Sequence, residues 1–369
     1  MAYTKIPVSI MRGGTSKAAV FYDKDLPADI EAREKFLCRA MGNPDTKQMD
    51  GLGGATLNTS KVVVIHDGDP YGADIAFTFY QVFVSKPGLT TKALCGNIST
   101  AVGPYAIEHG FVKPEKDGIF IVRAYNTNTK KYLKMYVPVV DGKVNYCGDY
   151  VTPGICEPSS KMGLEFCDPE GTFTPSVLPS GNAADVVALP DGTTARVSLV
   201  DATSPYVFID AEDLGVKGNE SPAQFQALAN KDEVLKKMDY IRDWAAVKCG
   251  LATSIETAKK EAPTLPKAGW VAKVAADDAD ADIASRMFTD GKMNPAYMAT
   301  TACCAATAAN IEGSIIARLT EGKDTAKGLR IRHSTGIMTA NLRSDENGKS
   351  IYVDRSARLI MDGNMYLDM

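Results

Sequence analysis

Cys95, which is followed directly by a Gly-Asn pair, is the first residue that could carry chemistry. Apolar residues recur at helical spacing over 98–109, which predicts a helix there. Asn97, Ser99 and Thr100 are residue types that favour a helix start. We therefore expect the sulfur at or just before a helix N-terminus, where unpaired N–H groups favour a thiolate and can hold a carboxylate or phosphate. The alternative is a small buried hydrophobe.

Lys61 is the second candidate for proton transfer. It follows Asn58-Thr59-Ser60 and begins a β-branched run at 62–65. Partial desolvation would lower the pKa of this lysine and make it a competent base. A solvated lysine at a strand end is the alternative, and the neighbouring residues do not decide between the two.

Two glycine-rich loops could bind an anion. The loop 12–17, Arg-Gly-Gly-Thr-Ser-Lys, offers backbone N–H groups together with Ser16 and Lys17, or it is a plain turn. It lacks the G-x-x-x-x-G-K-[ST] pattern of a phosphate loop. The loop 50–55 lacks the strand and helix that flank a dinucleotide site. Nucleotide binding is therefore not expected.

Other hydroxyl and thiol groups leave alternatives open. Cys303 and Cys304 could form an acid/base pair with Cys95, or they pack among alanine and threonine. The hydroxyls of Ser334 and Thr335 could bind a carboxylate or cap a turn.

Size and charge narrow the class of protein. The 369 residues are enough for two ordinary domains, and 45% hydrophobic with 23% charged residues is typical of a globular protein. A net charge of −4 and a pI near 5.6 argue against nucleic acid as a partner. Because no apolar run approaches the ~18 residues of a membrane span, and no secretory leader is recognisable, no membrane partner is expected.

The cysteines and histidines bear on compartment and cofactors. Eight cysteines scattered over a long chain indicate reduced thiols in a cytoplasmic protein. The three histidines show no i, i+4 pair and the cysteines no C-x-x-C, which argues against a zinc site and a histidine-based triad.

The elements that must position these residues are mostly strands, which indicates an α+β fold. We expect strands at 6–11, 18–22, 61–65, 75–84, 119–125 and 132–140, and helices at 28–41, 98–109, 223–230, 233–249 and 301–319.

A faint internal repeat runs through the chain. The strand-turn-strand 6–22 is followed much later by Cys95-Gly96-Asn97 and a small-residue helix, and 195–209 is followed by 300–304 and another such helix. Turn-forming clusters lie between 180 and 195. We therefore expect two similar domains, 1–185 and 186–369, with Lys61 and Cys95 in the first.

Several motifs in order resemble one family. They are Met11-Arg12-Gly13-Gly14-Thr15-Ser16-Lys17, Asp50-Gly51-Leu52-Gly53-Gly54, Thr59-Ser60-Lys61, Cys95-Gly96-Asn97 and His333-Ser334-Thr335-Gly336. As a set they resemble the PrpF family, which includes 2-methylaconitate cis-trans isomerase, methylitaconate Δ-isomerase and 4-oxalomesaconate tautomerase. The resemblance runs from Ile6 to near Leu367.

The resemblance implies the fold as well as the chemistry. The fold is α+β and diaminopimelate-epimerase-like: two similar domains, each a sheet wrapped around a central helix, with the active site in the cleft between them. The last strand can return to the first domain. The resemblance also implies an isomerase that needs no cofactor and no metal, with Lys61 and Cys95 as the acid/base residues.

The implied substrate is a small unsaturated di- or tricarboxylate such as methylaconitate, methylitaconate, aconitate or oxalomesaconate. One group removes an allylic proton, a dienolate forms, and a proton returns at the other end of the system. Which of Lys61 and Cys95 is the base stays open, because a shared proton couples their titrations. The substrate-binding residues expected around them are Thr15, Ser16, Lys17, Ser60, Gly96, Asn97, Ile98, Ser99, Thr300, Thr301, Ser334, Thr335 and Gly336.

Departures from the family pattern keep other functions in view. Ala18, the pair Ser334-Thr335 and the segment 299–302 differ from the residues that the family usually has there. An amino-acid racemase or epimerase with two opposed cysteines is one alternative, and a non-catalytic polycarboxylate-binding protein is another. The sequence does not determine the oligomeric state, for which a homodimer is one candidate.

Overall fold

The structure is a computed structural model that describes residues 3–368 apart from 290 and 347. The chain divides into two compact units. Unit 1 joins Met1–Cys167 to the last segment, Asp354–Met369, and unit 2 is Asp168–Val353. Each unit is built on a sheet of its own strands.

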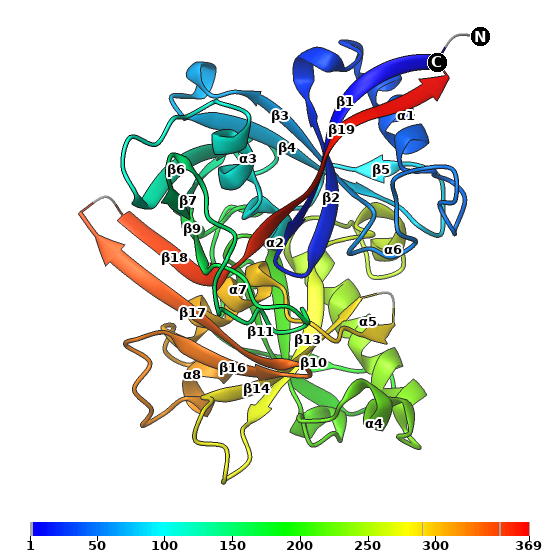
Figure 1. The fold of residues 1–369 in the computed structure, drawn as a ribbon. Helices are drawn as coiled ribbons and strands as arrows, with labels where there is room; N and C mark the ends of the chain where they lie inside the picture. The colour runs from blue at the N-terminus through cyan, green and yellow to red at the C-terminus, as the bar shows by residue number, and fades with distance from the viewer. Residues whose placement is uncertain (1–2, 290, 347, 369) are drawn as a thin grey trace. The chain divides into compact units, whose positions relative to one another are not determined.

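The sheet of unit 1 begins with the last strand of the chain. Its order is β19, β1, β2, β3, β4, β6, β7, β9, with β5 paired to β4 and β8 to β7 (Figure 1). The bounds are β19 (Ala357–Asp368), β1 (Tyr3–Gly13), β2 (Ser16–Tyr22), β3 (Lys61–Asp67), β4 (Ile75–Val82), β5 (Leu89–Thr90), β6 (Gly118–Asn126), β7 (Lys131–Val140), β8 (Lys143–Val144) and β9 (Met162–Cys167).

The sheet of unit 2 has the order β10, β11, β12, β13, β14, β16, β17, β18, with β15 paired to β14. The bounds are β10 (Asp185–Ala188), β11 (Thr194–Asp201), β12 (Pro205–Asp210), β13 (Lys267–Lys273), β14 (Ile283–Thr289), β15 (Lys292–Met293), β16 (Leu329–His333), β17 (Gly336–Asp345) and β18 (Gly348–Arg355).

The two sheets repeat the same pairing, strand for strand. In each, the second strand of the first hairpin runs parallel to the next strand, as β2 does to β3 and β12 to β13. A second parallel pair follows in each, β4 with β6 and β14 with β16, and the other pairs in both orders are antiparallel. This repeat confirms the two similar halves that the sequence predicted.

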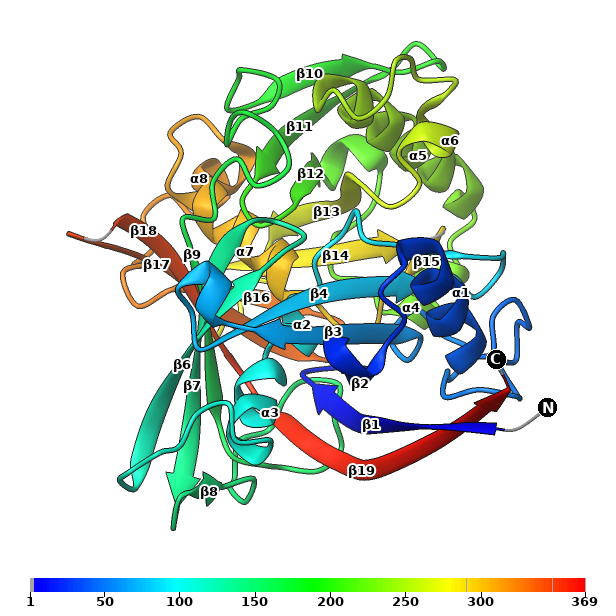
Figure 2. The ribbon, with the colours of Figure 1, turned by 90° about the horizontal axis from the view of Figure 1, so that it is seen from above.

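A helix lies against the sheet of each unit. In unit 1, α3 (Val102–Glu108) contacts β6, β7 and β8 toward one end of the strand order and β19 at the other, so the sheet curves around it (Figure 2). In unit 2, α7 (Ala299–Ala309) contacts β11, β12, β16 and β17 in the same way. Alanine, cysteine and threonine side chains make α7 thin enough for complete burial.

The helix expected at 98–109 is interrupted. It consists of α2 (Gly96–Ser99) and α3, with a turn at Thr100 and Ala101 between them. Pro104 has no N–H to donate to the carbonyl four residues earlier, and this explains the break. The helix expected at 301–319 is likewise split into α7 and α8 (Ile315–Leu319) at Gly313, whose φ of +84° lies in the left-handed region.

The other helices lie near their expected positions. They are α1 (Ile30–Ala40) in unit 1, and α4 (Pro222–Gln226) and α5 (Lys231–Lys248) in unit 2. The short helix α6 (Ala258–Glu261) was not expected, and short 3₁₀ turns are η1 (Asp23–Asp25), η2 (Asp69–Tyr71) and η3 (Glu212–Leu214). The apolar face of α1, with Phe36 and Leu37, packs in one core with Val62 and Val64 of β3. That core fixes the strand on which Lys61 stands.

The boundary between the units lies at Cys167/Asp168, whereas the sequence placed it at 185/186. The segment from Asp168 onward bonds to the strands of unit 2. Asp168 N–H donates to the Lys349 carbonyl, and the Asp201 carboxylate accepts from the N–H groups of Phe173 and Thr174. The last strand, β19, returns to unit 1.

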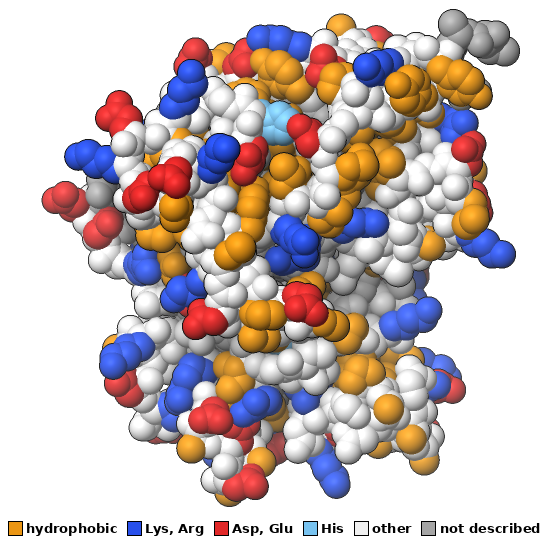
Figure 3. Space-filling view, viewed as in Figure 1, with side chains coloured by type: hydrophobic (Ala, Val, Ile, Leu, Met, Phe, Trp, Pro, Cys, Tyr) orange, Lys and Arg blue, Asp and Glu red, His pale blue; other side chains and the backbone are white. Residues whose placement is uncertain are grey.

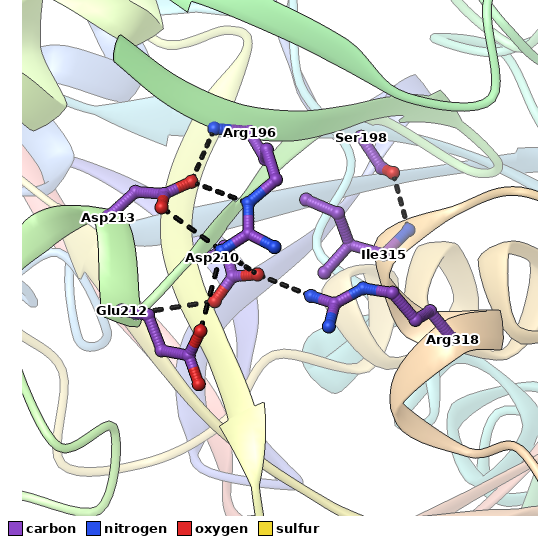
Figure 4. Close-up of polar contacts among 7 residues, drawn as sticks. All are labelled: Arg196, Ser198, Asp210, Glu212, Asp213, Ile315 and Arg318. Atoms are coloured by element: carbon purple, nitrogen blue, oxygen red, sulfur yellow. Dashed lines mark hydrogen bonds and ion pairs between the residues drawn. The ribbon is translucent and has the colours of Figure 1, made fainter. Parts of the chain in front are cut away.

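An ion-pair network ties the hairpin of unit 2 to η3 and α8 (Figure 4). The buried carboxylate of Asp210 accepts from the guanidinium groups of Arg196 and Arg318, and Arg196 also pairs with Glu212 and Asp213. Each charge in the network faces an opposite one, and this mutual pairing compensates the cost of burying Asp210.

Charged side chains of both signs are interspersed with apolar ones on the face seen in Figure 3. Among the described helices, none is long and apolar enough to cross a membrane.

Candidate active site

Cys95 occupies the N-cap of α2, as the sequence predicted. Its backbone is extended (φ −115°, ψ 94°), and its carbonyl accepts the first helical bond, from Ser99 N–H at 3.0 Å. The thiol is half-buried, whereas the residues from Gly96 to Ser99 are buried. Because α2 is a single turn, most of the electrostatic environment of the sulfur must come from neighbouring elements.

The turn between β1 and β2 packs directly on this helix start. A Cβ at Gly13 would lie 2.3 Å from the Asn97 carbonyl oxygen, and one at Gly14 would lie 2.5 Å from Asn97 Oδ1. Gly14 also has φ +49°, in the left-handed region. The Gly-Gly pair therefore allows the turn to touch the Cys-Gly-Asn segment.

The Asn97 side chain is held from both ends. Its Oδ1 accepts from Arg355 Nε at 3.0 Å, and its Nδ2 donates to Thr15 Oγ1 at 3.0 Å. Arg355 is only 2% exposed. Asn97 thus joins the β1–β2 turn, the helix start and Arg355, which belongs to the C-terminal segment of unit 1, with its amide orientation fixed by both bonds.

Lys61 is the first residue of β3 and is 6% exposed. Its Nζ donates to Gln81 Oε1 at 2.5 Å, across the β3–β4 pair in which the two residues stand opposite each other. Gln81 Nε2 donates to the carbonyls of Leu57, Ser60 and Val82 at 3.2, 2.9 and 3.2 Å. These donations leave the amide oxygen of Gln81 as the end that faces the amine.

Lys61 and Cys95 are electrostatically coupled. Burial lowers the pKa of Lys61, and the nearby Cys95 charge opposes that shift. Ser16 Oγ lies 3.5 Å from Cys95 Sγ, within reach of a hydrogen bond to the thiol or thiolate. The amine, the thiol and a hydroxyl therefore lie together in unit 1, on β3, the α2 N-cap and the start of β2.

Other expected residues of unit 1 surround this group with differing roles in the structure. The Ser60 hydroxyl donates to Gln48 Oε1 at 2.7 Å, and the Ser99 hydroxyl donates to the Cys95 carbonyl at 2.9 Å. Ile98 is fully buried in α2, and Lys17 is half-buried on β2.

The expected residues of unit 2 form two sets. Thr300 and Thr301 are buried in the first turn of α7, where Thr203 Oγ1 donates to the Thr300 carbonyl at 3.3 Å. Thr203 has φ +82°, which is strained for a β-branched residue.

The second set is the turn Ser334–Gly336 between β16 and β17. Thr335 Oγ1 donates to the Pro295 carbonyl at 3.1 Å and lies 3.3 Å from His333 Nδ1. Ser334 Oγ lies 3.8 Å from Met293 Sδ.

Cys303 and Cys304 lie inside α7 and are fully buried. The Cys304 thiol donates to the carbonyls of Ala202 and Ser204 at 3.1 and 2.9 Å, and burial raises its pKa to about 12. The N-cap of α7, which corresponds to the position of Cys95 in unit 1, is Met298. A protonated thiol held by carbonyls suits packing better than acid/base chemistry.

Three residues of the site, Gln81, Arg12 and Arg355, were not predicted as site residues from the sequence. Gln81 lies on the expected strand 75–84, but its place opposite Lys61 depends on the register between that strand and 61–65. Arg12 is part of a quoted motif, and its guanidinium donates to the Gly14 carbonyl and to Ser356 Oγ at 3.1 and 2.9 Å. Arg355 lies 258 positions from its partner Asn97 and has no local signal.

Within the described residues, no cluster of three or more histidine, cysteine, aspartate or glutamate side chains has the arrangement of a metal site. The chemistry that the arrangement itself offers is proton transfer by an amine and a thiol, in an environment with two guanidinium groups.

The repeated sheets, each curved around a helix, define the diaminopimelate-epimerase-like fold. The family described as PrpF protein matches residues 3–368. The chain belongs to the PrpF family.

Individual relatives cover nearly the whole chain. The 3-methylitaconate isomerase of Eubacterium barkeri is 33% identical over 377 residues, which cover 99% of this chain and 97% of that protein. The 2-methyl-aconitate isomerase of Shewanella oneidensis is 33% identical over 388 residues, covering 97% and 96%. The crystal structure of methylitaconate-delta-isomerase matches with a TM-score of 0.83 and 33% identity, covering 100% of this chain and 96% of that one.

Proposed function

We propose that this protein is an isomerase that moves a proton along the allylic system of a small unsaturated di- or tricarboxylate. The observation that carries the proposal is the buried Lys61 amine, held by Gln81 and coupled in charge to Cys95 at the start of α2. The similarity to methylitaconate and methylaconitate isomerases supports the substrate class.

The pair can both remove and return a proton. An amine with a thiol, and an ammonium with a thiolate, contain the same number of protons and differ only in which group is the base. One group takes the acidic allylic proton, charge spreads over the conjugated carboxylate as a dienolate, and the other group delivers a proton at the far carbon. General acid/base action of this kind contributes about 10²–10⁴-fold to the rate.

Positive charge and fixed dipoles stabilise the intermediate. Arg12 and Arg355 bond to the turn and to Asn97, respectively, so their charges lie beside the Cys95 segment. The Ser16 hydroxyl near the sulfur can donate to a substrate carboxylate or to the thiolate. Such preorganised groups act on the charge that develops in the dienolate. In unit 2, Thr300, Thr301 and the turn at 334–336 are further candidates for carboxylate binding.

An NMR experiment in D₂O tests the proposal. The protein is incubated separately with methylitaconate, methylaconitate, aconitate and oxalomesaconate, and each carbon is monitored for conversion and for deuterium. We expect a shifted double bond and deuterium at an allylic carbon with at least one of them, and loss of both in Lys61→Ala and Cys95→Ala. Binding without exchange at any carbon would contradict the proposal and indicate a polycarboxylate-binding protein.

A further inference from the structure

A cavity of unit 1 lies at the other end of the α2–α3 segment from Cys95. It has a volume of about 350 Å³ and is lined by the middle of β1, by β2, by Asp25 of η1 and by the C-terminal end of α3, with Asp362 of β19 beside them. Its volume is within the range of small-molecule sites. Figure 2 shows α3 next to β19, and the two elements are in contact.

The polar wall of the cavity is held by a chain of hydrogen bonds. The buried Ser9 Oγ donates to Asp362 Oδ1 at 2.8 Å. Because a hydroxyl has one proton to give, the contact of 3.1 Å between Ser9 Oγ and His109 Nε2 has the imidazole as the donor. β1, β19 and the end of α3 are thereby fixed to one another.

This Ser-His-Asp arrangement is not that of a hydrolase. In a catalytic triad, the histidine accepts the serine proton and the carboxylate bonds to the other ring nitrogen. In this cavity the Ser9 hydroxyl donates its hydrogen bond to Asp362, and Asp362 Oδ1 lies 3.8 Å from Nε2 of His109, the nitrogen that also faces Ser9. The serine is not activated, so the group is better suited to binding than to catalysis.

The lining of the cavity is aromatic and acidic. Tyr22 and Phe111 meet edge to face with ring centroids 5.5 Å apart, Tyr105 and Phe111 lie 6.1 Å apart, and Tyr105 stacks on the His109 ring at 4.0 Å. Asp25 and Asp362 supply two exposed carboxylates, and no lysine or arginine is among the described residues that line the cavity. Lys24, outside the lining, has its Nζ 5.3 Å from the centroid of the Tyr22 ring, so this ring already attracts a cation. Burial raises the pKa of Tyr105, and the negative charges of Asp362 and Asp25 raise it further.

We propose that this cavity binds a small organic cation, an ammonium group on a compact apolar body. Aromatic faces attract cations through their quadrupole, and the attraction increases when the cation loses water. The two carboxylates add to the preference for positive charge. The polycarboxylate of the proposed reaction is repelled by the same groups, so the two sites take ligands of opposite charge.

Isothermal titration with tetramethylammonium, methylammonium, the neutral tert-butanol and acetate tests the charge preference. We expect saturable binding of at least one of the two cations and none of tert-butanol or acetate. Equal binding of tert-butanol, preferential binding of acetate or no saturable cation binding would overturn the proposal.

Variants test the location. Asp362→Asn keeps an oxygen that can accept from Ser9 while removing the charge, and Asp25→Asn does the same at the other carboxylate. Each should weaken cation binding about tenfold with an unchanged Tm. Asp69→Asn, an exposed acid outside the lining, is the matched control and should bind like the wild type. Wild-type affinity in both cavity variants, with folding retained, would place the cation elsewhere and overturn the proposal.

A lysine of a second copy could present the same ammonium chemistry. Sedimentation velocity with and without tetramethylammonium distinguishes a free small cation from a lysine of a second copy. An unchanged sedimentation coefficient supports a free small molecule as the ligand. Dissociation of a dimer by the cation, and by Asp362→Asn without it, would overturn the small-molecule proposal in favour of an interface.

Discussion

Gln81 presents its amide oxygen, and not its amide nitrogen, to the amine of Lys61. The reason is local: Nε2 of Gln81 donates to three backbone carbonyls, so Oε1 is the atom left to face Nζ. A neutral acceptor in this position holds the amine in place in both protonation states without adding a charge. This arrangement keeps the lowering of the Lys61 pKa that burial causes.

Replacing that neutral acceptor by a charged one should change the pH dependence of the reaction. In Gln81→Glu, a carboxylate beside Nζ favours the ammonium and raises the pKa of Lys61. We expect the limb of the kcat/KM profile that Lys61 controls to move to higher pH by about one unit or more. Gln81→Leu, which adds no charge, should lower the rate without moving that limb, and superimposable profiles for Gln81→Glu and the wild type would contradict the role of Gln81.

The buried amine should also affect stability in a pH-dependent way. Because burial lowers the pKa of Lys61 in the folded state, the unfolded state binds more protons between that pKa and the ordinary value of 10.5. The free energy of unfolding therefore increases as the pH rises from the folded-state pKa of Lys61 to 10.5.

Urea unfolding from pH 7 to 10.5 measures this gain. The free energy of unfolding of the wild type relative to Lys61→Met should increase with pH until about 10.5. Lys113→Met, at an exposed lysine, is the control and should show a constant difference. A constant difference for Lys61→Met as well would mean that the amine is not desolvated.

The contact between the β1–β2 turn and α2 should be intolerant of one methyl group. In Gly13→Ala the Cβ would lie 2.3 Å from the Asn97 carbonyl oxygen and 2.9 Å from Ile98 Cα, so the helix start must move. We expect a loss of about 1–3 kcal/mol in the free energy of unfolding and a fall of about 10²-fold in kcat/KM. Gly363→Ala on β19, where no atom lies within 4 Å of the new Cβ, is the control for both measurements.

Thiol substitutions should separate an allylic isomerase from a two-cysteine racemase. Cys95→Ala should reduce turnover by about 10²–10⁴-fold. Cys303→Ala and Cys304→Ala should remain active, the latter with about 1 kcal/mol lower stability because the thiol proton shared between the Ala202 and Ser204 carbonyls is lost. Inactivation by Cys303→Ala or by Cys304→Ala, in a protein that keeps its near-ultraviolet circular dichroism, would favour the racemase.

Iodoacetamide labelling at pH 8 gives an independent measurement. Cys147 and Cys156 are exposed, Cys95 is half-buried and Cys304 is fully buried with a pKa raised to about 12. We expect activity to fall with the labelling of Cys95, and Cys304 to remain unmodified in the folded protein.

The local parts of the site could be predicted from the sequence, and the long-range parts could not. Cys95 at a helix start and Lys61 at a strand start are each readable from neighbouring residues. The partnership of Lys61 with Gln81 depends on strand register, which a stretch such as 66–74 does not fix by itself. The bond from Arg355 to Asn97 joins residues 258 positions apart.

The fold was likewise predictable in its local features and not in its long-range ones. The repeat was detectable because each half contains a hairpin, a helix start and a small-residue helix. The break at Thr100 was not predicted, because apolar periodicity continues through it while backbone bonding does not. The unit boundary depends on which strands the segment after Asp168 contacts, and local turn composition does not report this.

The difference between the two repeats has a stereochemical consequence. Unit 1 has a thiol at the start of α2, whereas unit 2 has Met298 at the start of α7. Proton exchange on opposite faces of a substrate requires two opposed groups, but Lys61 and Cys95 belong to one unit and sense each other's charge. We therefore expect the migrating hydrogen to leave and return on the same face of the planar dienolate, a suprafacial course that a chirally deuterated substrate would reveal.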